Sequence, residues 1–266
     1  GVNLFGNNAH ASIGTLTNSG TISGTVVDDR AYGVYLYAYS DSSTISTLTN
    51  SGTISGTATD DYGYGVYLRS YYDSSTISTL TNSGTISGTT FGVFLSGTGS
   101  GDGIITTLTN SGTISGTTYD IFNDRGQVIV NFNNQQGKKG NDVLTYNGTL
   151  PTNYNVIVAS TSDYGQASFT GESGTTNFGV SSSSSFSGTA TYASVISGLA
   201  TGKIGSTRSG TVGGYSWELV LQSGEIWDLV ITSSRAGYTS RITINSLSKI
   251  AAILEAINTA GSNSAL

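Results

Sequence analysis

Two pairs of adjacent aspartates are the side chains in this chain whose type and spacing best suit chemistry. Asp28 and Asp29 return as Asp60 and Asp61, and Arg30 and Arg69 stand near them. Clustered carboxylates with a cation and an arginine are suited to cleaving acidic polysaccharides, and carboxylate oxygens are also the ligands that Ca²⁺ prefers. The pair is absent from the next copy of the surrounding pattern, and no calcium-loop motif is present. We therefore treat calcium at Asp28, Asp29, Asp60 and Asp61 as a hypothesis beside the alternative that these aspartates only form turns.

Other catalytic combinations have little basis in the composition. The chain has one histidine, His10, and no cysteine, and none of its many serines stands in a GxSxG motif. A serine nucleophile needs a base that orients it, and one histidine outside any motif is a weak candidate for that role. We therefore expect a protein that is not an enzyme and needs no cofactor. The net charge of −6 gives no basic stripe for phosphates, so we also expect no nucleic-acid partner.

Aromatic residues recur at one position of a repeated GVxLx segment. They are Tyr35, Tyr67, Phe94 and Phe122, with Tyr37 beside them. In a strand these residues alternate with the apolar positions and point outward. An outward aromatic ladder could stack on sugar rings or pack against another molecule. The alternative is that the rings stabilise the stack of strands under neighbouring loops.

Threonines form a second predicted outward array. The pairs are Thr15 and Thr17, Thr47 and Thr49, Thr79 and Thr81, and Thr107 and Thr109. Ranks of paired threonines on a flat β face resemble those of ice-binding proteins. The alternative is that threonine simply suits an exposed strand.

A repeated segment must position all these side chains. TLTNSGTISGT begins unchanged at Thr15, Thr47, Thr79 and Thr107, and a GVxLx segment precedes each of these four copies. Self-similarity of this kind is typical of stacked-repeat proteins. Short strands separated by Asn-Ser-Gly and Ser-Gly turns predict a parallel β-helix in which each repeat is one turn of the coil.

Alternation along the strands predicts which side chains stack inside. The expected apolar files are Leu16/Leu48/Leu80/Leu108, Ile22/Ile54/Ile86/Ile114 and Val34/Val66/Val93/Ile121. The inward phase also holds Asn18, Asn50, Asn82 and Asn110, whose amides can hydrogen-bond along the file and so form a structural ladder.

The repeat pattern is lost after residue 123, and on this basis we divide the chain into three regions. Residues 1–148 are predicted to form the solenoid repeats, and residues 149–244 a non-repeating β-rich cap that contains both tryptophans. Residues 245–266 are predicted to form a short terminal helix and a tail, because apolar residues recur there at helical spacing.

Three features together resemble passenger domains of Gram-negative autotransporters, the type V secretion proteins. They are the LTNSGTISG repeat, the segments NYNVIVAS, WEL and IWDLV of the cap, and the closing helix. The resemblance implies a right-handed, roughly triangular β-helix that is secreted to the cell surface. The family's signal peptide and C-terminal translocator barrel are not in this sequence, so the link to the outer membrane is expected only through that missing barrel.

The function expected on these grounds is that of a non-enzymatic extracellular structural protein, an adhesin or a matrix fibre. A first strand that begins in the phase of the repeat suggests head-to-tail self-association into filaments. The alternatives are a glycan-binding module that uses the Tyr/Phe ladder and, less favoured, an ice-binding protein that uses the threonine ranks.

Overall fold

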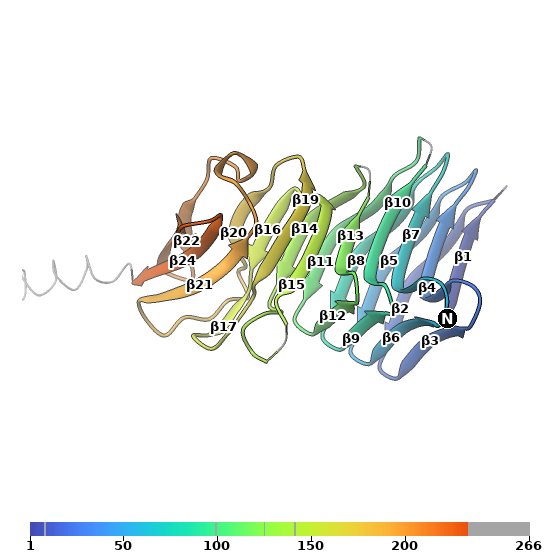
Figure 1. Cartoon of the computed structure of the whole chain (residues 1–266), viewed down its shortest axis with the longest axis horizontal. Coiled ribbons are helices and arrows are strands. Elements are labelled where there is room, and N and C mark those ends of the chain that lie inside the picture. Colours follow the sequence, from blue (N-terminus) through green and yellow to red (C-terminus); the bar gives the residue numbers. More distant parts are fainter. Residues whose placement is uncertain (8, 99, 125, 141, 234–266) are drawn as a thin grey trace, which may run out of the picture.

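The computed structural model describes residues 1–7, 9–98, 100–124, 126–140 and 142–233. The helix expected near the C-terminus lies outside these residues. The described chain is all-β, with 65% of residues in strands, and forms a parallel β-solenoid of about seven turns. Each turn is called a rung below. Figure 1 shows the rungs stacked along the long axis, with the N-terminal strands at one end.

Three sheets line the solenoid, and each early rung contributes one strand to each sheet. The first sheet, called sheet A, begins with β1 (Val2–Gly6), β4 (Ala31–Ala38), β7 (Gly63–Ser70), β10 (Phe91–Gly97), β13 (Tyr119–Asn123), β15 (Leu144–Thr149) and β19 (Ala167–Ser173). Sheet B contains β2 (Ala11–Asn18), β5 (Ser43–Asn50), β8 (Ser75–Asn82), β11 (Gly103–Asn110), β14 (Val128–Asn134), β16 (Asn153–Val156) and β20 (Asn177–Val180). Sheet C contains β3 (Thr21–Val26), β6 (Thr53–Ala58), β9 (Thr85–Gly88) and β12 (Thr113–Gly116).

The predicted apolar files form in register. Leu16, Leu48, Leu80 and Leu108 are successive partners in sheet B, and the file continues through Phe132, Tyr154 and Phe178. The isoleucine file of sheet C and the Val34/Val66/Val93/Ile121 file of sheet A align in the same way. From the second rung on, these side chains are fully buried. Burial of a Leu, Ile or Val side chain stabilises the fold by about 1.5–3 kcal/mol, so the stacked files are the main source of stability.

The buried asparagines form the predicted ladder. Asn18 Nδ2 donates to Asn50 Oδ1 at 2.8 Å, and Asn50 Nδ2 donates to Asn82 Oδ1 at 2.8 Å. Asn82 Nδ2 donates in turn to Asn110 Oδ1 at 2.9 Å. Asn110 Nδ2 donates to Gln136 Oε1 at 3.0 Å, so the ladder continues into the next rung. The ladder satisfies polar groups inside the core that water cannot reach.

The parallel stacking does not stop at residue 148, where we expected the repeats to give way to a cap. β15 pairs in parallel with β19, and β14, β16 and β20 pair in parallel in sheet B. The amide partners Asn18 and Asn50 are 32 residues apart, whereas Asn131 and Asn153 are 22 residues apart. Later rungs are shorter because sheet C ends at β12, and larger aromatic side chains replace leucine inside them. The solenoid therefore continues although its repeated sequence does not.

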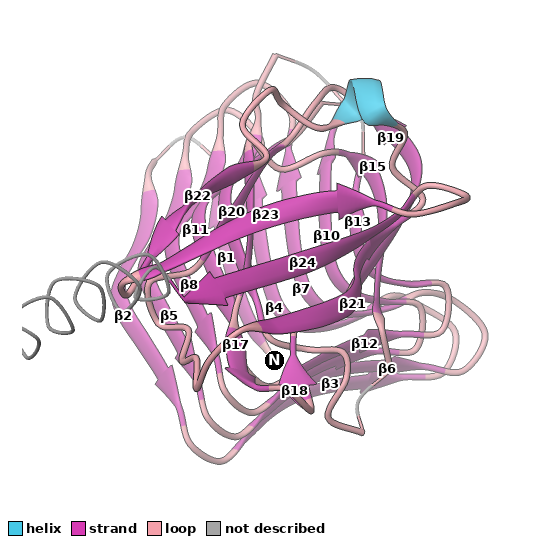
Figure 2. Ribbon diagram, turned by 90° about the vertical axis from the view of Figure 1, so that its left-hand side faces the viewer, coloured by secondary structure: helices cyan, strands magenta, loops and turns pink. Residues whose placement is uncertain are grey.

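The cap begins where strand direction changes. β21 (Ala190–Ser197) is parallel to β19 but antiparallel to β24 (Ile226–Ser233). β23 (Tyr215–Leu221) and β22 (Ser209–Val212) continue this antiparallel sheet. Figure 2 shows these strands crossing the end of the stack. The Trp227 indole is buried under them and donates to Leu199 O at 2.7 Å, so the cap covers core that a free end would expose to water.

A buried carboxylate joins the last rung of sheet C to the first shorter rung. Asp120 lies in β13 and is 7% exposed. Its oxygens accept hydrogen bonds from the backbone N–H of Gly116 at 3.1 Å and of Thr145 at 2.7 Å. Burial raises the pKa of Asp120, and these two hydrogen bonds offset part of the rise.

We expect Asp120→Ala to lower the free energy of unfolding by about 1–2 kcal/mol, because two partly buried N–H groups lose their acceptor. Since its pKa is raised in the folded state, wild-type stability gains from this group as pH falls through the folded-state pKa. Asp120→Asn removes that titration. Urea denaturation between neutral and acid pH measures the free energy of unfolding of the wild type and of Asp120→Asn. A difference between the two that stays constant with pH would contradict the prediction.

Candidate functional site

The predicted aromatic ladder lies on the outer side of sheet A. Tyr35, Tyr67, Phe94 and Phe122 are successive register partners. Their ring centroids are 5.2, 4.8 and 5.1 Å apart, and the planes are nearly parallel, at 24°, 21° and 15°. The rings therefore stack on one another along the solenoid axis.

A second aromatic file, which the alternation did not predict, lies beside the first. Its members are Tyr32, Tyr64, Phe91 and Tyr119. The two files interlock: Tyr32 is 4.4 Å from Tyr35, and Tyr64 is 4.7 Å from Tyr67. With strict alternation, the side chain of Tyr32 would point inward like that of Val34. The Tyr32 ring instead packs on the outer side of sheet A.

Glycine explains the reversal. A Cβ on Gly33 would lie 2.6 Å from Ile54 Cγ2, and one on Gly65 would lie 2.7 Å from Ile86 Cγ2, so both glycines face the core. Gly33 and Val34 are thus consecutive inward residues, and the residue before them turns outward. The repeated order aromatic-Gly-Val in the sequence is the signal that would have revealed the second file.

The ladder is fully covered only at Tyr67, and Tyr35, Phe94 and Phe122 are half-buried. Tyr67 and Tyr64 are each 4% exposed, and Phe91 is 7% exposed. The outward column that we predicted as a binding surface is therefore largely buried at Tyr67, because the second file and the neighbouring rungs cover the ring faces. Among the described residues, the aromatic rings with the greatest exposure lie around this core, at Phe5, Tyr39, Tyr62 and Tyr72.

Tyr37 lies at the edge of the ladder. Its ring is 5.0 Å from that of Phe5 and 6.0 Å from that of Tyr35. The Arg69 guanidinium lies over the Tyr37 ring, 5.0 Å from the centroid. The partner of Tyr37 in the next rung is thus an arginine, held by a cation–π contact.

An open hollow of about 600 Å³ lies over the ladder between the third and fifth rungs. Its lining consists of Arg30, Tyr62, Tyr64, Tyr67, Arg69, Phe91, Phe94, Ser96, Thr98, Phe122 and Asp124. A volume between about 300 and 1,000 Å³ with apolar walls and a few polar groups is typical of ligand sites. This hollow is called the aromatic groove below.

The aromatic groove has hydroxyl groups at its base and two positive charges near them. The hydroxyls of Tyr67 and Ser96 are hydrogen-bonded at 2.9 Å. Burial raises the pKa of Tyr67, while the bond with Ser96 and the charges of Arg69 and Arg30 act in the opposite direction. The phenol therefore stays protonated at neutral pH.

The four aspartates of the calcium hypothesis lie in the loops before β4 and β7, outside the groove. Asp29 Oδ1 accepts from the backbone N–H of Arg30, and Asp61 Oδ1 from that of Tyr62, each at 2.7 Å. Within the part of the chain that the structure describes, no three His, Cys, Asp or Glu side chains are grouped so that they could hold a metal ion. Asp29 and Asp61 thus bond to the backbone of their own turns, and the arginines near them in sequence line the aromatic groove. Calcium at Asp28, Asp29, Asp60 and Asp61 stays a prediction.

The threonine ranks lie on the outer side of sheet B, in register over four rungs. Asn131, Asn153 and Asn177 extend the first rank, and their amides hydrogen-bond along it at 2.9 and 3.2 Å. Ice binding by this face stays a prediction.

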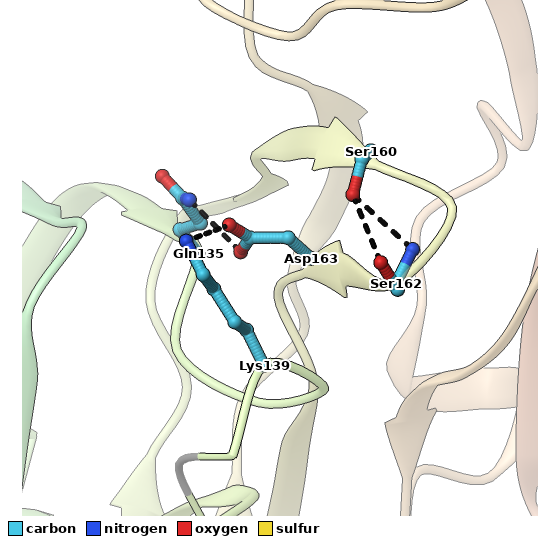
Figure 3. Close-up of polar contacts among 5 residues, drawn as sticks. All are labelled: Gln135, Lys139, Ser160, Ser162 and Asp163. Carbon is cyan, nitrogen blue, oxygen red and sulfur yellow. Dashed lines mark hydrogen bonds and ion pairs between the residues drawn. The ribbon is translucent and has the colours of Figure 1, made fainter.

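The Lys138-Lys139 pair lies in a loop that backbone and side-chain contacts join to the solenoid, and Lys138 N donates to Tyr164 O at 3.1 Å. Lys139 Nζ is 2.9 Å from Asp163 Oδ2, and Gln135 Nε2 donates to Asp163 Oδ1 at 3.0 Å (Figure 3). Burial would raise the pKa of Asp163, but Gln135 and Lys139 together hold it below its usual value. These contacts fasten the loop to the hairpin of β17 (Val158–Ser160) and β18 (Asp163–Tyr164), which is a structural role.

No protein-family model, curated protein or solved structure matches this chain. Within the described residues, no helix has the length and apolar character of a membrane-spanning segment. The class of this protein is therefore defined by its fold and its groove. It is a repeat protein of the parallel β-solenoid type, with an arginine-flanked aromatic groove on one face.

Proposed function

We propose that this chain is a non-enzymatic extracellular structural protein, an autotransporter-like passenger that acts as an adhesin by binding glycans in the aromatic groove. The observation that carries the proposal is the groove itself, with aromatic rings, hydroxyls and two arginines on a backbone fixed by parallel strand pairing. A site on regular strands is held more rigidly than one on loops, which favours binding to a repetitive polymer.

The chemistry of the groove fits sugars. Sugar rings present apolar C–H faces and hydroxyl edges, and they are bound by aromatic rings with polar groups beside them. In the groove, the exposed Tyr62 side chain provides an aromatic ring, and Ser96 and Thr98 provide hydroxyl groups.

The proposal excludes catalysis for a reason of composition. Glycoside hydrolysis uses two carboxylates, and the described lining of the groove includes one, Asp124. His10, the single histidine, is not part of that lining. Self-association into filaments and a role as a matrix fibre remain predictions beside this proposal.

We expect Tyr62→Ser to weaken glycan binding about three- to tenfold, because an exposed aromatic contact contributes about 0.5–1.5 kcal/mol. Tyr62 is 48% exposed, so its replacement should leave the fold intact. A printed array of neutral and acidic glycans identifies the bound sugars, and titration calorimetry with the best of them measures the variant.

Tyr72→Ser is the matched control, because Tyr72 is 58% exposed and does not line the groove. It should bind within about twofold of wild type. Equal losses in the two variants would place binding elsewhere, and an array with no retained glycan would refute the proposed function.

A further inference from the structure

The two arginines of the aromatic groove approach it from opposite ends of the strands. Arg30 directly precedes β4, whereas Arg69 lies near the end of β7. Both charges act on the phenol of Tyr67, which also lines the groove. The sequence has only 10 Lys and Arg in 266 residues and a net charge of −6, so two cations beside one hollow make it locally positive in an acidic protein.

Aromatic residues surround both guanidinium groups. Arg69 lies over the Tyr37 ring and its charge acts on the hydroxyl of Tyr35, while the charge of Arg30 acts on the hydroxyl of Tyr32. A guanidinium that stacks on a ring keeps its N–H edge available, and this planar edge matches a carboxylate bidentately. Positioning by rings therefore prepares the arginines for an anion.

The protein does not use these arginines in ion pairs of its own. Across the described residues, neither guanidinium lies within the 4.0 Å of a carboxylate oxygen that defines an ion pair. Burial lowers the pKa of Arg30, whereas neighbouring tyrosines and, to the smallest extent, Asp61 raise it. Asp124 also lines the groove and its charge acts on the phenol of Tyr67 as well, so the described lining holds two positive charges and one negative charge.

We propose that the aromatic groove binds an acidic glycan whose sugars carry carboxylate groups, with Arg69 and Arg30 as the carboxylate ligands. This inference rests on the proposed function, since it names the class of glycan for the same groove. Arg30 and Arg69 bind carboxylates at the two ends of the groove, a sugar ring packs beside Tyr62 at the Arg30 end, and sugar hydroxyls face Ser96 and Asp124 at the Arg69 end.

The test uses one sugar chain in two charge states. A hexasaccharide of galacturonic acid and its methyl ester share a backbone, but only the acid carries carboxylates. Calorimetry with the wild-type chain should give binding of the acid at least about tenfold tighter than binding of the ester, because hydrogen bonds between charged groups are about twice as strong as neutral ones. The preference should decrease as salt is added.

Substitutions of the two arginines test whether these residues cause the preference for the acid over the ester. Arg69→Gln should weaken binding of the acid about tenfold and leave binding of the ester unchanged. Arg30→Gln should act in the same direction, and because Arg30 is exposed and outside any strand, this variant tests the idea even if Arg69→Gln is unstable. Lys138→Gln removes the same unit of charge from an exposed position outside the groove and should have no effect.

The possible failures are distinguishable. Equal binding of acid and ester, or an equal loss in Lys138→Gln, would overturn the acidic-glycan inference while leaving glycan binding in place. Binding of neither chain would count against this inference, and an array that retains no glycan would refute the proposed function as well.

Discussion

Asn50→Ala is expected to lower the free energy of unfolding by about 3–4 kcal/mol, although the substitution removes a single polar side chain. The Asn50 Nδ2 group donates to Asn82 Oδ1 at 2.8 Å and to Thr85 O at 2.9 Å, and its Oδ1 accepts from Asn18 at 2.8 Å. Asn50 has no exposed surface, so water cannot replace these partners. Each buried group left without a partner costs about 1–3 kcal/mol, and alanine leaves at least two of them.

The matched control for Asn50→Ala is Asn131→Ala in the same sheet. Asn131 also belongs to an amide ladder, since Asn153 Nδ2 donates to its Oδ1 at 2.9 Å, but it lies on the outer side and is partly exposed. Water can satisfy its neighbours, so the expected loss is below about 1 kcal/mol. Urea denaturation followed by far-ultraviolet circular dichroism measures both variants. Equal losses would show that the inner ladder contributes no more than a surface contact.

Gly65→Ala is expected to destabilise the fold by about 2–3 kcal/mol and to disturb the aromatic files. A Cβ at Gly65 would lie 2.6 Å from Gly92 O and 2.7 Å from Ile86 Cγ2. The first contact is with backbone of the next rung, so β7 or β10 must shift. Because Gly65 separates Tyr64 from the inward Val66, such a shift changes how Tyr64 packs against Tyr67.

Gly14→Ala is the control for Gly65→Ala, because Gly14 also lies in a strand and a Cβ there would meet nothing within 4 Å. It should be neutral or slightly stabilising. Near-ultraviolet circular dichroism reports on the stacked tyrosines and should change for Gly65→Ala alone. An unchanged spectrum with full stability would mean that the inward glycine is not required for the second aromatic file.

Both scaffold predictions also bear on the groove. The ladder of buried amides fixes the distance between rungs, and the inward glycines place two aromatic files on one face. A variant that alters either should weaken glycan binding without removing a residue of the groove, because the lining comes from several successive rungs.

The repeated sequence by itself determined the stacking. Identical residues at a fixed spacing are most stable when they pair in register, because a slip would place Leu48 or Asn50 against a residue of different size or polarity. The apolar files, the asparagine ladder and the positions of most later strands follow from that rule. Local periodicity is a property of the sequence, so it can be read without the structure.

Only the tertiary structure decided the extent of the solenoid and the nature of its surface. Phe132, Tyr154 and Phe178 continue the leucine file without any repeated sequence, because a shorter rung with larger side chains fills the same core. Tyr67 is covered and Tyr62 is exposed because exposure depends on which neighbouring rungs and loops lie over a ring. Arg30 and Arg69 are brought to one groove by strands of different rungs, a relation that no spacing along the chain expresses.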